Sequence, residues 1–196
     1  MPAVRRISRD AIVDAAVEVL REGGFSAVNA RSVAKKLGCS TQPIYSSFQN
    51  MDELKAALRA RATALHTQRV QDSLRAHEGN DTRYSSYGMG FVKFAVEEKQ
   101  LFRLLFMRDR SHEPHQEKEG AEVAALMTEL VQKNAGLNEQ SARMLYLENW
   151  IYVHGIASMI ATGYLEFDEA DISVMMTDVY RGLTLRAGEV EKNGCR

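Results

Sequence analysis

The chain of 196 residues has little proline, cysteine or tryptophan, with three, two and one of these residues. So few prolines, beside many Ala, Leu, Glu and Arg residues, favour an all-helical fold because proline breaks helices. The two cysteines, Cys39 and Cys195, do not suggest a disulfide framework, and we interpret both as reduced thiols. A hydrophobic content of 45% with 26% charged residues is ordinary for a globular protein with a buried core.

Several sequence signals of other protein classes are missing. No apolar run approaches eighteen residues, and the segment from Ile7 onward is amphipathic rather than leader-like, so we expect a cytoplasmic protein with no membrane partner. A nucleophile elbow, a phosphate-binding glycine loop and a dinucleotide fingerprint are also missing. We therefore expect no enzyme activity and no cofactor.

One cluster of metal-binding residue types needs its own assessment. His112, Glu113, His115 and Glu117 lie close together in a polar segment, but Pro114 separates the histidines. Neither an HExxH helix nor a cysteine pair accompanies them, so a solvated loop is favoured over a metal site.

The most informative segment is residues 29–48, NARSVAKKLGCSTQPIYSSF. Asn29 can cap a helix that ends at Leu37, whose apolar positions repeat at i, i+3, i+4 and i+7. Gly38 suits a left-handed C-terminal position, and Ser40 is the expected cap of a second helix that has Pro43 in its first turn. Two short helices joined by a glycine turn are typical of a helix-turn-helix.

Helices are also predicted on both sides of this segment. Ser8 is the expected cap of a first helix that ends at Gly23 and Gly24 and carries an apolar stripe. The stripe consists of Ile12, Ala15, Ala16, Val19 and Leu20. Downstream, Asn50 and Glu53 form a variant of the capping box and open a helix through Leu54, Leu58 and Leu65.

Residues 8–55 resemble the DNA-binding domain of the tetracycline-repressor (TetR) family. The shared elements are Ala15 and Ala16, Gly23 to Phe25, the RSVAKKLG stretch from Arg31 to Gly38, Tyr45 to Phe48, and Glu53 with Leu54. One departure is Met51, because the family usually has a lysine there that contacts a phosphate. Lys55, one helical turn further on, could supply that charge.

The resemblance implies a dimeric transcription regulator that binds a palindromic operator in double-stranded DNA, most often a repressor released by a small-molecule ligand. Outward-facing hydroxyls, amides and cations of the helix-turn-helix suit phosphates and base edges. The candidate DNA-binding residues are Arg31, Ser40, Thr41, Gln42, Tyr45, Ser46, Ser47 and Lys55.

The rest of the chain is predicted to form a second helical domain. We place the helix-turn-helix domain at residues 1–50, a connecting helix at 51–77, and an effector-binding and dimerisation domain at 78–196. Within the last, helices are expected at 82–97, 99–107, around 123–131, at 138–163 and at 168–191.

Residues 150–155, WIYVHG, resemble the W-x-x-x-H-G motif of the WHG-type TetR subfamily. An indole and an imidazole one turn apart could face a small apolar or amphipathic effector, or could simply pack in the core. The candidate ligand-binding residues are Met89, Phe94, Phe102, Phe106, Met127, Tyr146, Trp150 and His154.

TetR-like proteins generally dimerise through their last two long helices, so the resemblance implies a homodimer here. Small residues in one helix allow close approach, and an apolar stripe in the other is long enough to pack along a partner. The candidate dimer contacts are Gly155, Ser158, Thr162, Ile172, Met176, Val179 and Leu183.

The charge distribution is uneven although the net charge is only −1. Residues 1–60 have nine Lys or Arg against six Asp or Glu, a net +3, and the remainder has sixteen against twenty, a net −4. The positive part coincides with the expected DNA-binding domain. A charge of +3 is modest, so a helical protein-interaction module with a degenerate helix-turn-helix stays open as an alternative.

Overall fold

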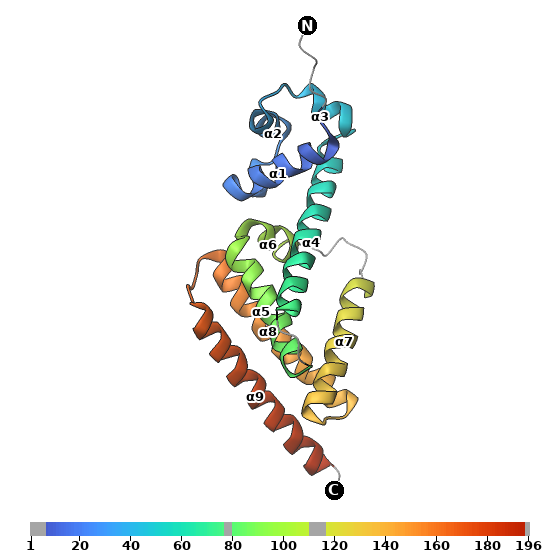
Figure 1. Ribbon diagram of the computed structural model, residues 1–196, viewed down its shortest axis with the longest axis vertical. Helices are drawn as coiled ribbons and strands as arrows, with labels where there is room; N and C mark the ends of the chain where they lie inside the picture. The colour runs from blue at the N-terminus through green and yellow to red at the C-terminus, as the bar shows by residue number, and fades with distance from the viewer. Residues whose placement is uncertain (1–6, 77–79, 110–116, 195–196) are drawn as a thin grey trace. The chain divides into compact units, whose positions relative to one another are not determined.

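The computed structural model describes residues 7–76, 80–109 and 117–194, and over these residues the chain is helical with no strand (Figure 1). This confirms the all-α fold class. The elements are α1 (Arg9–Gly23), the 3-10 turn η1 (Phe25–Ala27), α2 (Ala30–Leu37), α3 (Gln42–Ser47), α4 (Met51–Arg75), α5 (Asn80–Glu97), α6 (Lys99–Phe106), α7 (Glu117–Ala135), α8 (Glu139–Thr162) and α9 (Glu169–Gly194).

The chain divides into two compact units. Unit 1 comprises Met1–Thr67 and Glu98–Arg108, and unit 2 comprises Gln68–Glu97 and Asp109–Arg196. The division differs from the boundary expected at residue 78, because it falls inside α4 and because α6 packs against α1. The apolar side of α6 is buried there, including Leu101 and Phe102.

Unit 1 is held together by the apolar stripe of α1. Ile12, Ala16 and Leu20 are completely buried, and Ile44 of α3 and Phe48 just after it are almost completely buried. A helix of six residues such as α3 has little stability of its own, so these contacts fix it in place.

The ends of the short helices follow the sequence signals with one exception. The Asn29 side chain accepts hydrogen bonds from the backbone N–H groups of Arg31 and Ser32, each at 3.0 Å, and so caps α2. Gly38 adopts φ 66° and ψ 34°, the left-handed conformation that ends α2. The prediction of Ser40 as cap of α3 is wrong, because Thr41 is the N-cap residue and no side chain caps this helix.

Unit 2 is built around α8, on which α5, α7 and α9 pack (Figure 1). Its predicted helices are confirmed to within a few residues, and α7 begins earlier than expected, at Glu117. The core cluster joins side chains from all four helices and from Leu137 just before α8. Its buried members are Tyr84, Met127, Leu130, Val131, Leu137, Ala142, Leu145 and Ala187.

Some sequence-based expectations concern residues outside the described ranges. Cys195 and residues 112–115 of the histidine-rich segment belong to this group. For the described part of the chain, none of the helices is both long enough and apolar enough to cross a membrane.

Gly38 offers a stability test of the turn. A Cβ atom at this position would meet nothing within 4 Å, so the strain of a substitution comes from the positive φ alone. We expect Gly38→Ala to lower the free energy of unfolding by about 1 kcal/mol, and Gly38→Asn by less, because Asn tolerates this conformation better. Urea unfolding followed by circular dichroism measures both values, and equal stability of Gly38→Ala and wild type would contradict the expectation.

Candidate nucleic-acid interface and effector core

The second helix of the helix-turn-helix, α3, exposes a polar face. Gln42 and Ser46 are exposed, and 57% of Tyr45 is accessible. The Ser46 hydroxyl donates to the Gln42 carbonyl at 2.9 Å, so it can accept a further hydrogen bond without rearrangement. Thr41 is half-buried, and its hydroxyl is not used to cap α3. The structure thus brings these four residues together at one short helix.

The remaining candidate DNA contacts flank this helix. Arg31 on α2 and Ser40 in the turn are exposed, whereas Ser47 is half-buried. The Lys55 ammonium lies 5.5 Å from the centre of the Phe25 ring, a distance suited to a cation–π contact. Met51, where a lysine was expected, is half-buried at the start of α4.

Arg9, which the sequence gave no reason to select, ties the end of α3 to α1 and α4. Its guanidinium donates to the Ser47 carbonyl at 2.5 Å, pairs with Glu53 at 2.8 Å and lies 4.0 Å from the centre of the Phe48 ring. Hydrogen bonds from the backbone N–H of Gln49 and from Arg9 lower the pKa of Glu53. Arg9 therefore positions the helix that presents Tyr45.

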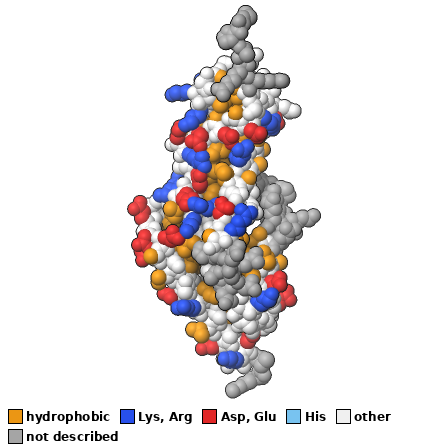
Figure 2. All heavy atoms as spheres, in the orientation of Figure 1, with side chains coloured by type: hydrophobic (Ala, Val, Ile, Leu, Met, Phe, Trp, Pro, Cys, Tyr) orange, Lys and Arg blue, Asp and Glu red, His pale blue; other side chains and the backbone are white. Residues whose placement is uncertain are grey.

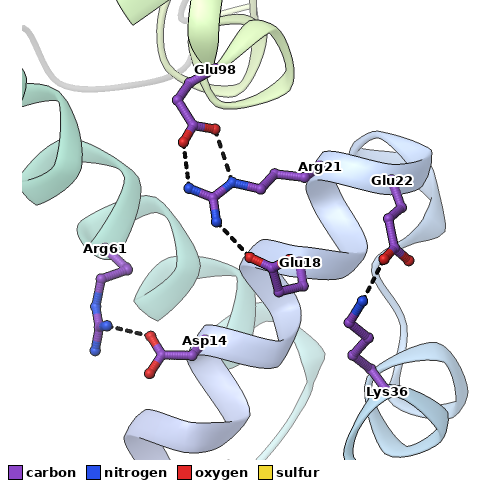
Figure 3. A network of polar contacts seen from close by, with 7 residues as sticks. All are labelled: Asp14, Glu18, Arg21, Glu22, Lys36, Arg61 and Glu98. Carbon is purple, nitrogen blue, oxygen red and sulfur yellow. Dashed lines mark hydrogen bonds and ion pairs between the residues drawn. The ribbon is translucent and has the colours of Figure 1, made fainter.

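A network of ion pairs joins the helices of unit 1 (Figure 3). The Arg21 guanidinium on α1 binds both carboxylate oxygens of Glu98, the residue before α6, with one contact at 2.9 Å, and it also pairs with Glu18. Arg61 on α4 pairs with Asp14. Hydrogen bonds that the guanidinium donates to the Glu98 carboxylate are the main cause of a raised Arg21 pKa.

On the face that Figure 2 shows, charges of both signs occur without one continuous basic patch. Figure 2 shows Lys and Arg side chains interspersed with Asp and Glu on the visible face. On α2, Lys36 pairs with Glu22, which reduces the positive charge available near the helix-turn-helix. Affinity for phosphates must then come from a few placed cations and hydrogen-bond donors rather than from bulk charge.

The candidate ligand-binding residues are divided between the two units. Phe102 and Phe106 belong to unit 1, and the other six belong to unit 2. Phe94, Phe102 and Met127 are at most 2% exposed and serve as core. The half-buried members are Met89, Phe106, Tyr146, Trp150 and His154.

Trp150 and His154 lie in an aromatic group between α5 and α8. The Phe91 ring lies 4.6 Å from Trp150 and 5.5 Å from His154, and the Tyr87 ring lies 6.0 Å from Trp150. Burial lowers the pKa of His154, whose Nδ1 is 3.3 Å from the Ser158 hydroxyl. Phe91 and Tyr87 were missed by the sequence analysis because their α5 segment shows no motif.

A pocket of about 170 Å³ lies on another side of α5. Its lining includes Met89, the one predicted ligand residue in it, together with Arg69 and Lys93. Arg69 pairs with Glu97, and Lys93 pairs with Glu169 at 2.6 Å. The volume is below the roughly 300 Å³ typical of sites for drug-sized ligands.

The candidate dimer contacts differ between the two last helices. On α9, Ile172 and Met176 are 3% and 7% exposed, and Leu183 packs against the core cluster of unit 2. Ile172 and Met176 are therefore largely covered within their own protomer, whereas Val179 is half-buried. On α8, Gly155 and Ser158 are half-buried and Thr162 is exposed.

An apolar outer stripe of α8 continues the line of small residues. Met144, Leu147 and Ile151 are exposed there, and they precede Gly155 at helical spacing. On α9 the outward side has Val174 and Leu185, the latter 71% exposed. Large apolar side chains on the outer faces of two adjacent helices are characteristic of an interaction surface.

Comparisons with known proteins agree with this architecture. Residues 12–58 match the family model described as bacterial regulatory proteins of the tetR family, and residues 85–181 match the model of the tetracyclin repressor-like C-terminal domain. The second model is not described as the WHG type, so that part of the resemblance is not confirmed.

Two curated relatives are transcription regulators. The chain is 23% identical over 163 residues to the uncharacterised HTH-type transcriptional regulator YobS of Bacillus subtilis, covering 83% of this chain and 84% of that protein. It is 28% identical over 141 residues to the HTH-type transcriptional activator FasR of Mycolicibacterium smegmatis, covering 70% and 64%.

Solved structures share the fold at low sequence identity. A protein of unknown function from Rhodococcus sp. RHA1 superposes with a TM-score of 0.71 at 20% identity, covering 94% of this chain and all of that one. A TetR variant of Acinetobacter baumannii AYE in complex with minocycline gives 0.53 at 20% identity, covering 94% and 97%.

Together the exposed recognition helix, the helical second unit and both family matches define a DNA-binding transcription regulator. The chain belongs to the TetR family.

His66 on α4 gives a pH test of unit 1. Its ring packs edge-on against Phe106 at 5.1 Å, and burial lowers its pKa from 6.5 to about 4. Between pH 6.5 and 4, His66 binds a proton in the unfolded chain but not in the folded chain. The neutral, buried His66 therefore makes its full contribution to stability above pH 6.5, and this contribution is lost as the pH falls toward 4.

We expect the wild type to lose up to about 3 kcal/mol between pH 7.5 and 4 through this group, and His66→Gln to lose correspondingly less. Urea unfolding across this pH range measures the difference between the two proteins. Parallel pH profiles would contradict the assignment, since all other titrating groups are common to both.

Proposed function

We propose that the protein is a homodimeric regulator that binds a palindromic operator and is released from it by a small apolar or amphipathic ligand, most simply as a repressor. The observation that carries this proposal is the recognition helix α3, whose polar residues are exposed while Ile44 and Phe48 hold it in the core. Two such helices in a symmetric dimer would read half-sites about one helical turn of DNA apart or a little more.

Within each half-site, we assign base contacts to Gln42 and Ser46 and phosphate contacts to Thr41, Tyr45 and Lys55. An amide can pair in two places with adenine, and a hydroxyl accepts or donates according to the base. Phosphates need donors and cations, which the other three provide. Arg31, Ser40 and Ser47 surround the helix and are proposed as further backbone contacts.

The proposed dimer joins the outer faces of α8 and α9 from two protomers. Met144, Leu147 and Ile151 supply apolar area, and Gly155 lets helices approach closely because a Cβ there would meet nothing within 4 Å. Ser158 and Thr162 continue the same stripe. Four helices packed in this way would form a bundle that sets the spacing of the two recognition helices.

A ligand acts on such a dimer only if it binds the DNA-competent and DNA-released states with different affinities. A change in α5 can reach the DNA-binding domain through the chain itself. Helix α5 ends at Glu97, and the next residue, Glu98, binds Arg21 of the DNA-binding domain. The minocycline complex of the Acinetobacter protein is a precedent for ligand binding in a relative of this fold.

The sign of regulation is tested separately from DNA binding. FasR of Mycolicibacterium smegmatis is an activator, so a repressor role for this chain rests on the frequency of repressors in the family. A reporter fused to the promoter upstream of the gene distinguishes the two roles: deletion of the regulator raises expression for a repressor and lowers it for an activator.

Tyr45 tests the proposed DNA contact. With DNA from the region upstream of the gene, we expect Tyr45→Phe to weaken binding about fivefold, because one phosphate hydrogen bond is lost while the exposed ring remains. Fluorescence anisotropy over a range of salt concentrations measures the change. Tyr164→Phe is the matched control, since Tyr164 is 77% exposed in the α8–α9 connection.

Equal affinity of Tyr45→Phe and wild type at every salt concentration would remove Tyr45 from the interface. No binding of the wild type even at low salt would favour the alternative, a protein-interaction module with a degenerate helix-turn-helix.

Ile151 tests the proposed dimer. Ile151→Glu would bury two unpaired carboxylates in the interface, so we expect dimer formation to weaken by at least about 3 kcal/mol and operator affinity to fall with it. Sedimentation velocity measures the oligomeric state. The control is Val190→Glu, an equally exposed position on α9 outside the outer stripe, and a dimeric Ile151→Glu protein would move the interface elsewhere.

A further inference from the structure

A buried polar pair crosses the apolar core of unit 2. The side-chain amide of Asn149 on α8 donates to the Tyr84 hydroxyl on α5 at 3.0 Å. Asn149 is 6% exposed and Tyr84 is 8% exposed, although 65 positions separate them in the chain. Both belong to the part of the molecule where an effector site is proposed.

The pair retains hydrogen-bonding capacity that its protein neighbours do not use. The buried Asn149 Oδ1 atom has no donor among the residues that the structure describes. The Tyr84 hydroxyl, which accepts from Asn149, still has its own hydrogen to donate. A reversed amide would exchange these roles but leave the pair with both a donor and an acceptor to offer. Buried polar atoms in this state are uncommon in native proteins and need a reason.

The surroundings of the pair are apolar and aromatic. The Tyr180 ring on α9 lies 5.0 Å from the Tyr84 ring, and the other members of the core cluster include no Lys, Arg, Asp or Glu. Burial raises the pKa of Tyr84 and raises that of Tyr87 to about 12. An environment that disfavours ionised tyrosine also disfavours a charged ligand group.

A flexible side chain fills the space one helical turn from Tyr84. At Gly88 on α5, a Cβ atom would lie 2.6 Å from the terminal methyl group of Met176 on α9 and 3.6 Å from Val153 on α8. Methionine has several rotatable bonds and adapts to different apolar neighbours. Rotation of Met176 would therefore open space beside Gly88, one helical turn from Tyr84, without moving a helix.

We propose that Tyr84 and Asn149 form the polar anchor of the effector site and bind a neutral ligand group that both donates and accepts hydrogen bonds, namely an alcohol or a primary amide on an apolar body. The proposal rests on the proposed function, since it names the chemistry of the ligand that function requires. In it, Asn149 Oδ1 accepts from the ligand and Tyr84 donates to it.

Three probes with the same apolar chain and different polar ends test this chemistry. 1-Octanol donates and accepts, octyl methyl ether only accepts, and octanoate is charged at neutral pH. The single tryptophan, Trp150, follows Asn149 directly, so intrinsic fluorescence reports binding at this place in the full-length protein. We expect octanol to bind at least about tenfold more tightly than either other probe, because only octanol uses both partners.

Two variants separate the anchor from general packing. Asn149→Leu and Tyr84→Phe should each weaken octanol binding about tenfold and leave ether binding of Asn149→Leu unchanged. Tyr164→Phe, an exposed position, should bind octanol as the wild type does. Asn149→Leu removes the unpaired acceptor but also the donor to the buried Tyr84 hydroxyl, so we expect it to melt below the wild type. Tyr84→Phe keeps the ring in the core and serves as the second test.

The outcomes distinguish this inference from the proposed function. In one outcome the ligand-free protein binds its operator but does not bind octanol, or binds octanol equally well in the wild type and both variants. This outcome overturns the proposed role of Tyr84 and Asn149 as a ligand anchor and leaves a water molecule as the natural partner of the pair. Tighter binding of octanoate than of octanol overturns the neutral ligand class. Loss of operator binding in the ligand-free wild type would instead count against the proposed function itself.

Discussion

The proposed DNA-reading surface depends on one constraint: α3 has six residues and cannot be stable alone. Its position is fixed by Ile44 and Phe48 in the core of unit 1, and by Arg9, which binds the carbonyl at its last residue. Arg9 is therefore more than a surface cation, because it joins α1, the end of α3 and Glu53 of α4. The residues that hold α3 in place are therefore separate from the exposed residues to which we assign DNA contacts.

Unit 2, in contrast to α3, does not depend on single contacts for its stability. Its helices are long and its core is large, so stability does not require a polar pair inside it. Apolar side chains in place of Tyr84 and Asn149 would fill the core and leave no hydrogen-bonding group unsatisfied, whereas this pair leaves one buried acceptor without a donor. Such groups in natural proteins tend to be retained for a purpose other than stability. The unmet hydrogen bonds and the flexible Met176 beside Gly88 support the proposal that the pair serves ligand binding rather than stability.

The features that could be predicted from the sequence are those with a local cause. Asn29, Gly38 and the stripe of α1 act within a few residues, so the caps of α1 and α2, the turn and the helix order were predicted correctly. The cap of α3 was wrong by one residue, because Ser40 and Thr41 are chemically equivalent candidates. On α9, Ile172 and Met176 are buried within the chain, and the sequence did not foretell this, since an apolar stripe does not reveal whether its partner is the same chain or a second copy.

Contacts between distant segments were not predictable in this way. The Tyr84–Asn149 bond and the Arg21–Glu98 pair join residues 65 and 77 positions apart, and neither lies in a motif. The Arg21–Glu98 pair also differs from the Tyr84–Asn149 bond in its exposure to solvent. Arg21 and Glu98 are partly exposed, so their attraction is screened and contributes little to stability. A weak pair that is geometrically specific can orient α1 against the residue before α6 without locking it there. An interaction of this strength suits the proposed ligand response, because the free energy of binding a small ligand is sufficient to shift it.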